Sequence, residues 1–126
     1  MEKEVVEYFR NLLLSQLEEL LSEGKRTIVS IQEHEGTSFA DPVEQAFVDQ
    51  HLNMKFRIKD RESKLIKKIR EALARIDDGT FGICEICEDE ISTARLKARP
   101  VTTQCIECKQ RGEQWERITE QKAQMQ

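Results

Sequence analysis

The four cysteines of this 126-residue chain form two close pairs, Cys84-x-x-Cys87 and Cys105-x-x-Cys108, separated by seventeen residues. Two such pairs can place four thiolates at the corners of a tetrahedron around one Zn²⁺, with Zn–S distances of about 2.3 Å. Four protein ligands leave no coordination position for a reacting water, which indicates a structural metal. A redox dithiol needs only one such pair, and a cytosolic chain rarely keeps disulfides. The spacing therefore predicts one structural zinc ion in a finger over residues 79–110.

Two amphipathic segments precede the cysteines. In the first, apolar or small residues recur at steps of three and four, which is typical of a helix with one buried stripe: Val6, Phe9, Leu13, Leu17, Leu20, Gly24, Ile28 and Ile31. The second segment repeats this spacing at Phe47, His51, Met54, Ile58, Arg61, Leu65, Ile69, Ala72 and Ile76. Turn-forming residues separate the two segments. Two such stripes predict an antiparallel coiled-coil hairpin over residues 1–78, with its tip near residues 34–45.

The remaining segment, residues 111–126, is predicted to form a C-terminal helix whose Trp115 and Ile118 pack against the zinc-finger base. The predicted fold class is therefore mainly α: a long antiparallel coiled-coil hairpin, a small globular base with a C4 zinc finger, and a C-terminal helix. No run of eighteen apolar residues occurs, so we expect no membrane span. The acidic, periodic N-terminus is unlike a signal peptide, so we expect a cytoplasmic protein.

The net charge of −4 conceals an uneven distribution. Residues 55–75 contain nine Lys or Arg but only three Asp or Glu. An acidic total argues against a protein that coats DNA through phosphate contacts, whereas the basic stretch leaves room for one local anion site. A zinc finger that binds nucleic acid directly remains an alternative, which the acidic surroundings of the cysteines disfavour. We find no nucleophile–base pair, open metal site or phosphate-cradling glycine loop, so we expect no enzymatic activity.

The stretch "DPVEQA", Asp41 to Ala46, places two carboxylates around a proline just before the second segment. Asp41 is a good N-cap residue, Pro42 suits the first helical position, and Glu44 completes a capping box. Considered alone, these residues favour a helix cap.

Four stretches occur in the same order and with fitting spacing in the DksA/TraR family of bacterial transcription regulators: "DPVEQA", "RESKLIKKIREAL", "DDGTFGICEIC" and "EISTARLKARPVTTQCIECK". The chain resembles this family over residues 39–110. The resemblance implies a monomer that binds RNA polymerase directly and not promoter DNA. Its coiled coil would enter the secondary channel while the base stays on the rim. With guanosine tetraphosphate (ppGpp), it would destabilise promoter complexes, repress ribosomal RNA promoters and activate amino-acid biosynthesis promoters.

The resemblance also implies roles for particular residues. The family's tip motif D-x-x-D-x-A is matched at Asp41 and Ala46, while Glu44 replaces the second aspartate. These tip residues would act near the catalytic Mg²⁺ of the polymerase. Arg61, Lys68 and Lys109 match positions that form a ppGpp site together with the polymerase rim. The departure at Glu44 leaves open a DksA-like paralogue with altered tip activity and weak ppGpp dependence.

Overall fold

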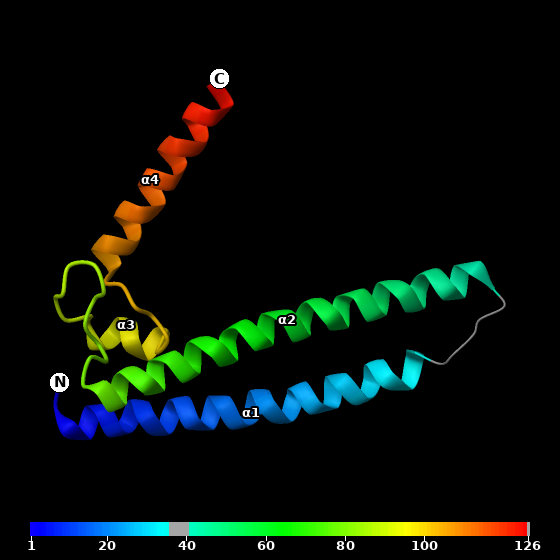
Figure 1. The fold of residues 1–126 in the computed structure, drawn as a ribbon, viewed down its shortest axis with the longest axis horizontal. Coiled ribbons are helices and arrows are strands. Elements are labelled where there is room, and N and C mark those ends of the chain that lie inside the picture. Colours follow the sequence, from blue (N-terminus) through cyan, green and yellow to red (C-terminus); the bar gives the residue numbers. More distant parts are fainter. Residues whose placement is uncertain (36–40, 126) are drawn as a thin grey trace. The chain divides into compact units, whose positions relative to one another are not determined.

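The computed structural model describes residues 1–35 and 41–125, which divide into two compact units. Unit 1 comprises Met1–Arg10 and Glu71–Gln126, and unit 2 comprises Asn11–Arg70. The described residues form α1 (Lys3–Glu35), α2 (Pro42–Asp78), α3 (Thr93–Ala98) and α4 (Ile106–Met125) (Figure 1). In these ranges the structure contains no strand, only an isolated antiparallel bridge between Ile83 and Glu90. The predicted mainly helical fold class is confirmed.

Unit 2 is a pair of helices, residues 11–35 of α1 and 42–70 of α2, that lie side by side in opposite directions (Figure 1). A Cβ atom added to Gly24 would lie 2.8 Å from Lys59 Nζ. Further along, Lys55 Nζ donates a hydrogen bond to Ser30 Oγ. The residue that contacts Ser30 therefore precedes the one that contacts Gly24 along α2, so the two helices run in opposite directions. The predicted antiparallel hairpin is confirmed.

The predicted stripe of α1 is confirmed over most of its length. Phe9, Leu13 and Gly24 are buried, and the stripe residues between and before them are half-buried: Val6, Leu17 and Leu20. The prediction is wrong at Ile28, whose side chain is 41% exposed, because Thr27 and Ser30 face inward there instead. The side chain of Ile31 lies outside the described residues.

The predicted stripe of α2 is correct only at its C-terminal end, where Ile69, Ala72 and Ile76 are buried. Earlier in the helix the prediction is wrong, because the other six predicted residues are exposed: Phe47 (68%), His51, Met54 (62%), Ile58 (46%), Arg61 and Leu65 (38%). The side chains that are half-buried instead are Gln45, Val48, Leu52, Lys55, Lys59, Glu62 and Ile66.

The helical repeat does not distinguish between these two sets of residues. A step of four back from Ile69 leads to Leu65 and a step of three leads to Ile66, and both paths continue to Glu62. The repeat by itself therefore does not select the side of α2 that faces α1.

The core of unit 1 forms around Phe9, which is fully buried. Its ring centroid lies 5.5 Å from that of Phe81 and 5.2 Å from that of Tyr8, the latter in an edge-to-face arrangement. Such offset aromatic pairs are favourable beyond the area that they bury. Ile91 and Leu96 complete this core beside the cysteines.

A glycine ends α2 and directs the chain toward the cysteines. Gly79 has a φ of 78°, and its N–H donates to Ile76 O at 3.3 Å while Thr80 N–H donates to Arg75 O at 2.9 Å. These two bonds make a Schellman motif, which requires the left-handed conformation that glycine adopts without strain.

The predicted packing of α4 is wrong. Trp115 is 70% exposed and Ile118 is also exposed, and Cys108 is the buried residue among those described in this helix. The helix is therefore held through its first turn, where Cys108 lies. No helix within the described ranges has the length and apolar composition that crossing a bilayer requires.

Candidate metal centre and charged surfaces

The structure brings the four cysteines of unit 1 together. Their Sγ atoms all lie within 4.8 Å of one another, and the Sγ atoms of Cys87 and Cys105 are 3.7 Å apart. A tetrahedron with metal–sulfur distances of about 2.3 Å has edges of about 3.8 Å. A disulfide would instead need about 2.05 Å between the sulfurs. Cys84 and Cys108 are buried, so the donor set and its geometry fit one tetrahedral metal ion.

The first cysteine pair is held by a tight turn of the backbone. Cys84 N–H donates to Asp89 O at 2.8 Å, and Glu88 N–H donates to Cys84 O at 3.0 Å. Glu88 has a φ of 64°, a left-handed conformation that is uncommon for a residue other than glycine. Gly82, with a φ of 82°, accepts a hydrogen bond from Ile91 N–H and closes the loop around the pair. The chain therefore reverses so that both thiols point to the same centre.

The second cysteine pair straddles the start of α4. Lys109 N–H donates to Cys105 O at 3.0 Å, which places Cys108 in the first helical turn. The preceding segment, residues 102–104, is held by two charged side chains. Arg95 Nε donates to Gln104 O at 2.9 Å, and Glu85 Oε1 accepts hydrogen bonds from both Thr103 Oγ1 and Gln104 Nε2 at 3.2 Å.

Arg95 and Glu85 are positioning residues that the sequence pattern did not indicate. Arg95 is the third residue of α3, whose start is capped by Ser92 Oγ accepting from Arg95 N–H at 3.3 Å. Neither residue is a cysteine, so the spacing of the Cys-x-x-Cys pairs gives no indication of its role. Only the folded chain shows that they connect the two cysteine pairs.

The metal-free thiols differ in their affinity for protons. Hydrogen bonds from the backbone of Cys87 and of Cys105 lower the pKa of Cys84 to about 6. The side-chain hydrogen bond with Cys105, together with burial, raises the pKa of Cys108 to about 12. Because metal ligands must be thiolates, metal binding must displace the proton of Cys108. Because bound thiolates compete with protons, occupancy of this centre falls as the pH falls.

The predicted tip residues that the structure describes lie in the first turn of α2. Val43 N–H donates to Asp41 Oδ1 at 2.9 Å, and Gln45 N–H donates to Asp41 O at 3.0 Å, so Asp41 caps the helix. Asp41, Glu44 and Ala46 are all exposed. Residues 36–40 of the predicted tip lie outside the described residues. The cap therefore holds one carboxylate at the N-terminus of α2 while leaving it exposed.

The three predicted ppGpp-binding cations are all exposed, but they are distributed over the two units. Arg61 and Lys68 belong to unit 2, seven residues apart, which places them on the same side of α2. Lys109 belongs to unit 1 and follows the last cysteine. The convergence of all three on one anion stays a prediction.

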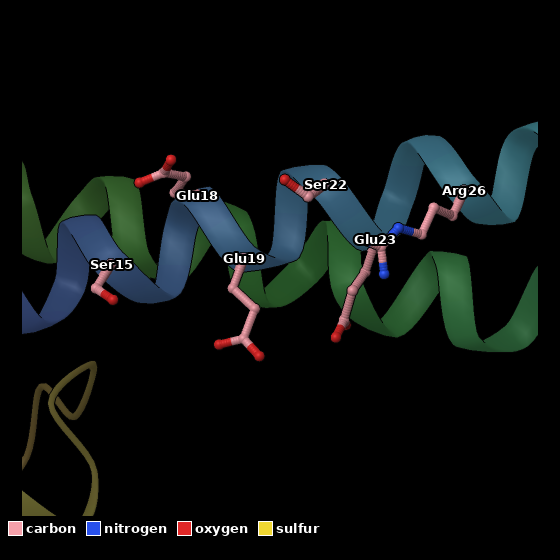
Figure 2. A pocket seen from close by; sticks show the side chains of 6 residues that line it. All are labelled: Ser15, Glu18, Glu19, Ser22, Glu23 and Arg26. Carbon is pink, nitrogen blue, oxygen red and sulfur yellow. The ribbon is translucent and has the colours of Figure 1, made fainter.

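An open depression on α1 carries the opposite charge. It is lined by Ser15, Glu18, Glu19, Ser22, Glu23 and Arg26, all of them exposed (Figure 2). Exposed acidic side chains are ordinary on a solvated helix face, so we assign no ligand to this depression. It does show that the outward surface of α1 is acidic, in contrast to the basic outward surface of α2.

Comparison with known families accounts for most of the chain. Residues 5–76 match the family model described as "DnaK suppressor protein DksA, N-terminal domain". Residues 79–114 match the one described as "Prokaryotic dksA/traR C4-type zinc finger". The second match contains all four cysteines, in agreement with the clustering of their sulfurs.

Individual relatives agree with these matches. The RNA polymerase-binding transcription factor DksA of Haemophilus influenzae is 38% identical over 109 residues, which cover 86% of this chain and 74% of that protein. The protein of the same name in Caulobacter vibrioides is 39% identical over 113 residues, or 90% and 79% of the two chains. The structure of transcription factor DksA2 from Pseudomonas aeruginosa superposes with a TM-score of 0.85 at 35% identity, covering 93% and 89%. The chain therefore belongs to the DksA family and carries the C4-type zinc finger of that family.

Proposed function

We propose that this chain binds bacterial RNA polymerase directly and regulates transcription. The observation that carries this proposal is the match to both DksA family models, with relatives named as RNA polymerase-binding transcription factors. In this proposal the protein is a cytoplasmic monomer without enzymatic activity. One structural Zn²⁺, held by Cys84, Cys87, Cys105 and Cys108, stabilises unit 1.

The helical hairpin of unit 2 enters the secondary channel of the polymerase, and the base occupies the rim. Asp41 and Glu44 then bring negative charge near the catalytic Mg²⁺, which destabilises promoter complexes. Support comes from the exposure of both carboxylates and from the cap that restrains Asp41. A restrained side chain loses less conformational entropy when it binds than a mobile one does.

A transcription assay with purified bacterial polymerase on a ribosomal RNA promoter tests this proposal. Asp41→Asn keeps an acceptor for Val43 N–H, and Asn caps helices as well as Asp does. It removes only the charge. We expect the variant to bind polymerase and keep its helicity by circular dichroism, yet to lose most of the inhibition. Full inhibition by Asp41→Asn would mean that this carboxylate is only a cap.

The glutamate at position 44 favours a second candidate, a paralogue with altered tip activity. Glu44→Asp restores the family motif D-x-x-D-x-A. If Glu44 tunes the tip, this variant inhibits more strongly than the wild-type protein at equal polymerase occupancy. Unchanged inhibition would show that the extra methylene has no effect and would leave the first candidate.

The polyanion ppGpp is the proposed effector, bound by Arg61, Lys68 and Lys109 together with the polymerase rim. Several converging cations are needed to hold its phosphates, and arginine can bind one of them bidentately. We expect Lys68→Ala to weaken the response to ppGpp more than it weakens polymerase binding. Lys67→Ala, an exposed neighbour on a different side of α2, is the matched control. Equal losses in both assays would count against the assignment.

Direct binding of the zinc finger to DNA is disfavoured by its surface charge. Glu85, Glu88, Asp89 and Glu90 are exposed around the first cysteine pair, where phosphates would be repelled. A gel-shift assay with bare promoter DNA is expected to show no complex. A salt-sensitive complex without polymerase would overturn the proposal of a purely protein-bound regulator.

A further inference from the structure

The helix α2 distributes its apolar and charged residues in an unusual way. Six large apolar side chains between residues 43 and 65 are exposed. Phe56 lies on a different side of the helix, and the other five share one side: Val43, Phe47, Met54, Ile58 and Leu65. Over the same stretch the side facing α1 includes three charged side chains, Lys55, Lys59 and Glu62. Soluble helices normally place their apolar stripe on the inside and their charges outside. The exposed stripe is therefore not explained by packing within this chain.

The five residues that share one side, which we call the outer stripe, follow one another along the helix. At 3.6 residues per turn they fall within an arc of roughly 60°, and at 1.5 Å per residue they extend over about 33 Å of the helix. Isolated exposed apolar residues are normal on protein surfaces, whereas a contiguous stripe marks an interaction site.

Positive charge borders the outer stripe on one edge. The same helical geometry places four exposed bases within roughly 60° of one another along that edge: Arg57, Arg61, Lys64 and Lys68. The complementary surface must therefore combine apolar side chains with carboxylates along one side.

We propose that the outer stripe is the face by which this hairpin docks on RNA polymerase, against an apolar surface bordered by Asp or Glu. This inference rests on the proposed polymerase binding and specifies the face and the chemistry that accomplish it. Burial of Phe47, Met54 and Ile58 supplies affinity, because large side chains at the centre of an interface contribute most of the binding energy. The basic edge fixes orientation and raises the association rate.

Charge disfavours a second copy of this chain as the occupant. Pairing two outer stripes in antiparallel orientation by a twofold axis would place the two basic edges on the same side of the interface, where they repel. Pairing the outer stripe with the acidic outward face of α1 would join two different faces of the chain. Such contacts form rings or open chains.

The test compares two triple variants in equilibrium binding to immobilised purified bacterial polymerase. The first, Phe47→Gln, Met54→Gln, Ile58→Gln, removes the centre of the outer stripe and leaves the proposed ppGpp-binding residues intact. The matched control, Leu14→Gln, Leu21→Gln, Val29→Gln, changes three exposed apolar residues of α1. Glutamine is a good helix former, so both variants should keep their helices.

We expect the outer-stripe variant to keep its circular dichroism spectrum and unfolding midpoint but to bind polymerase at least about tenfold more weakly, or 1.4 kcal/mol. The control should bind within about twofold of wild type. Replacing Arg57 and Lys64 with Gln should additionally reduce the salt dependence of binding.

Each other outcome overturns the inference in a recognisable way. Wild-type affinity of the outer-stripe variant would refute the docking face while leaving polymerase binding intact. Absence of binding by the wild-type protein would refute the proposed function, and this inference with it. Unfolding of the outer-stripe variant would show that these residues pack inside the chain. Sedimentation that shows wild-type oligomers and a monomeric variant would assign the stripe to a second copy.

Discussion

Glu62 lies on the side of α2 that faces α1, and its replacement by leucine should stabilise the hairpin. Glu62 Oε2 is buried and has no hydrogen-bond partner among the described residues, and it lies 4.0 Å from where a Cβ atom on Gly24 would be. A buried acceptor without a partner costs about 1–3 kcal/mol. Leucine removes this cost, and half-burial of its side chain adds about 1 kcal/mol.

The loss of attraction to Lys59, one helical turn away, works against this gain. That loss is about 0.3–0.5 kcal/mol, because the pair is of the ordinary helix-surface kind and the ammonium can extend to water. The expected net stabilisation of Glu62→Leu is therefore about 1.5–3.5 kcal/mol. With a urea m-value of about 2 kcal/mol/M, the unfolding midpoint rises by about 0.8–1.8 M.

Urea titration followed by circular dichroism at 222 nm measures this shift. Glu71→Leu is the matched control, because it makes the same change at an exposed position of the same helix. Glutamate and leucine have similar helix propensities, so the control should change stability by less than about 0.5 kcal/mol. A midpoint for Glu62→Leu at or below that of wild type would refute the argument that the buried, unpaired carboxylate destabilises the hairpin.

Three further predictions concern unit 1. Phe9→Ala should lower the free energy of unfolding by about 3–5 kcal/mol, because the ring is fully buried; a loss below about 1 kcal/mol in urea titration would contradict this packing. Gly82→Ala and Gly79→Ala should both lower the thermal midpoint. Both positions have a positive φ, which strains any residue with a Cβ; at Gly82 the added Cβ would meet the flexible end of the Met1 side chain, which can move aside, and at Gly79 it would meet nothing within 4 Å. A wild-type midpoint for both variants would argue against the left-handed conformation at these positions. Cys108→Ser should abolish stoichiometric zinc measured by mass spectrometry, and zinc loss from the wild-type protein to a chelator should become more complete as the pH falls, since protons compete for the thiolates. Retention of zinc by Cys108→Ser, or pH-independent loss, would argue against a four-thiolate site.

The sequence alone was sufficient where the determining residues are close together along the chain. Each cysteine pair is local, and the two-residue spacing already orients both thiols, so the ligand set was predicted before any fold was known. The cap at Asp41 is equally local, since it depends on a residue and the first turn of the helix that follows it. The spacing of three and four residues established that α1 and α2 are helices and which face of α1 is buried at Phe9 and Leu13.

Tertiary structure decided what depends on segments far apart in sequence. Arg95 and Glu85 hold residues 102–104 through hydrogen bonds, and these bonds join parts of the chain that no local pattern connects. On α2, periodicity specified a helix with an apolar stripe but not which of two neighbouring faces meets α1. In the folded chain Phe47, Met54 and Ile58 are exposed, whereas Lys59, Glu62 and Ile66 on the neighbouring side are half-buried. A helical repeat determines how side chains are spaced along the helix. Only packing against another element determines how the helix is rotated about its own axis.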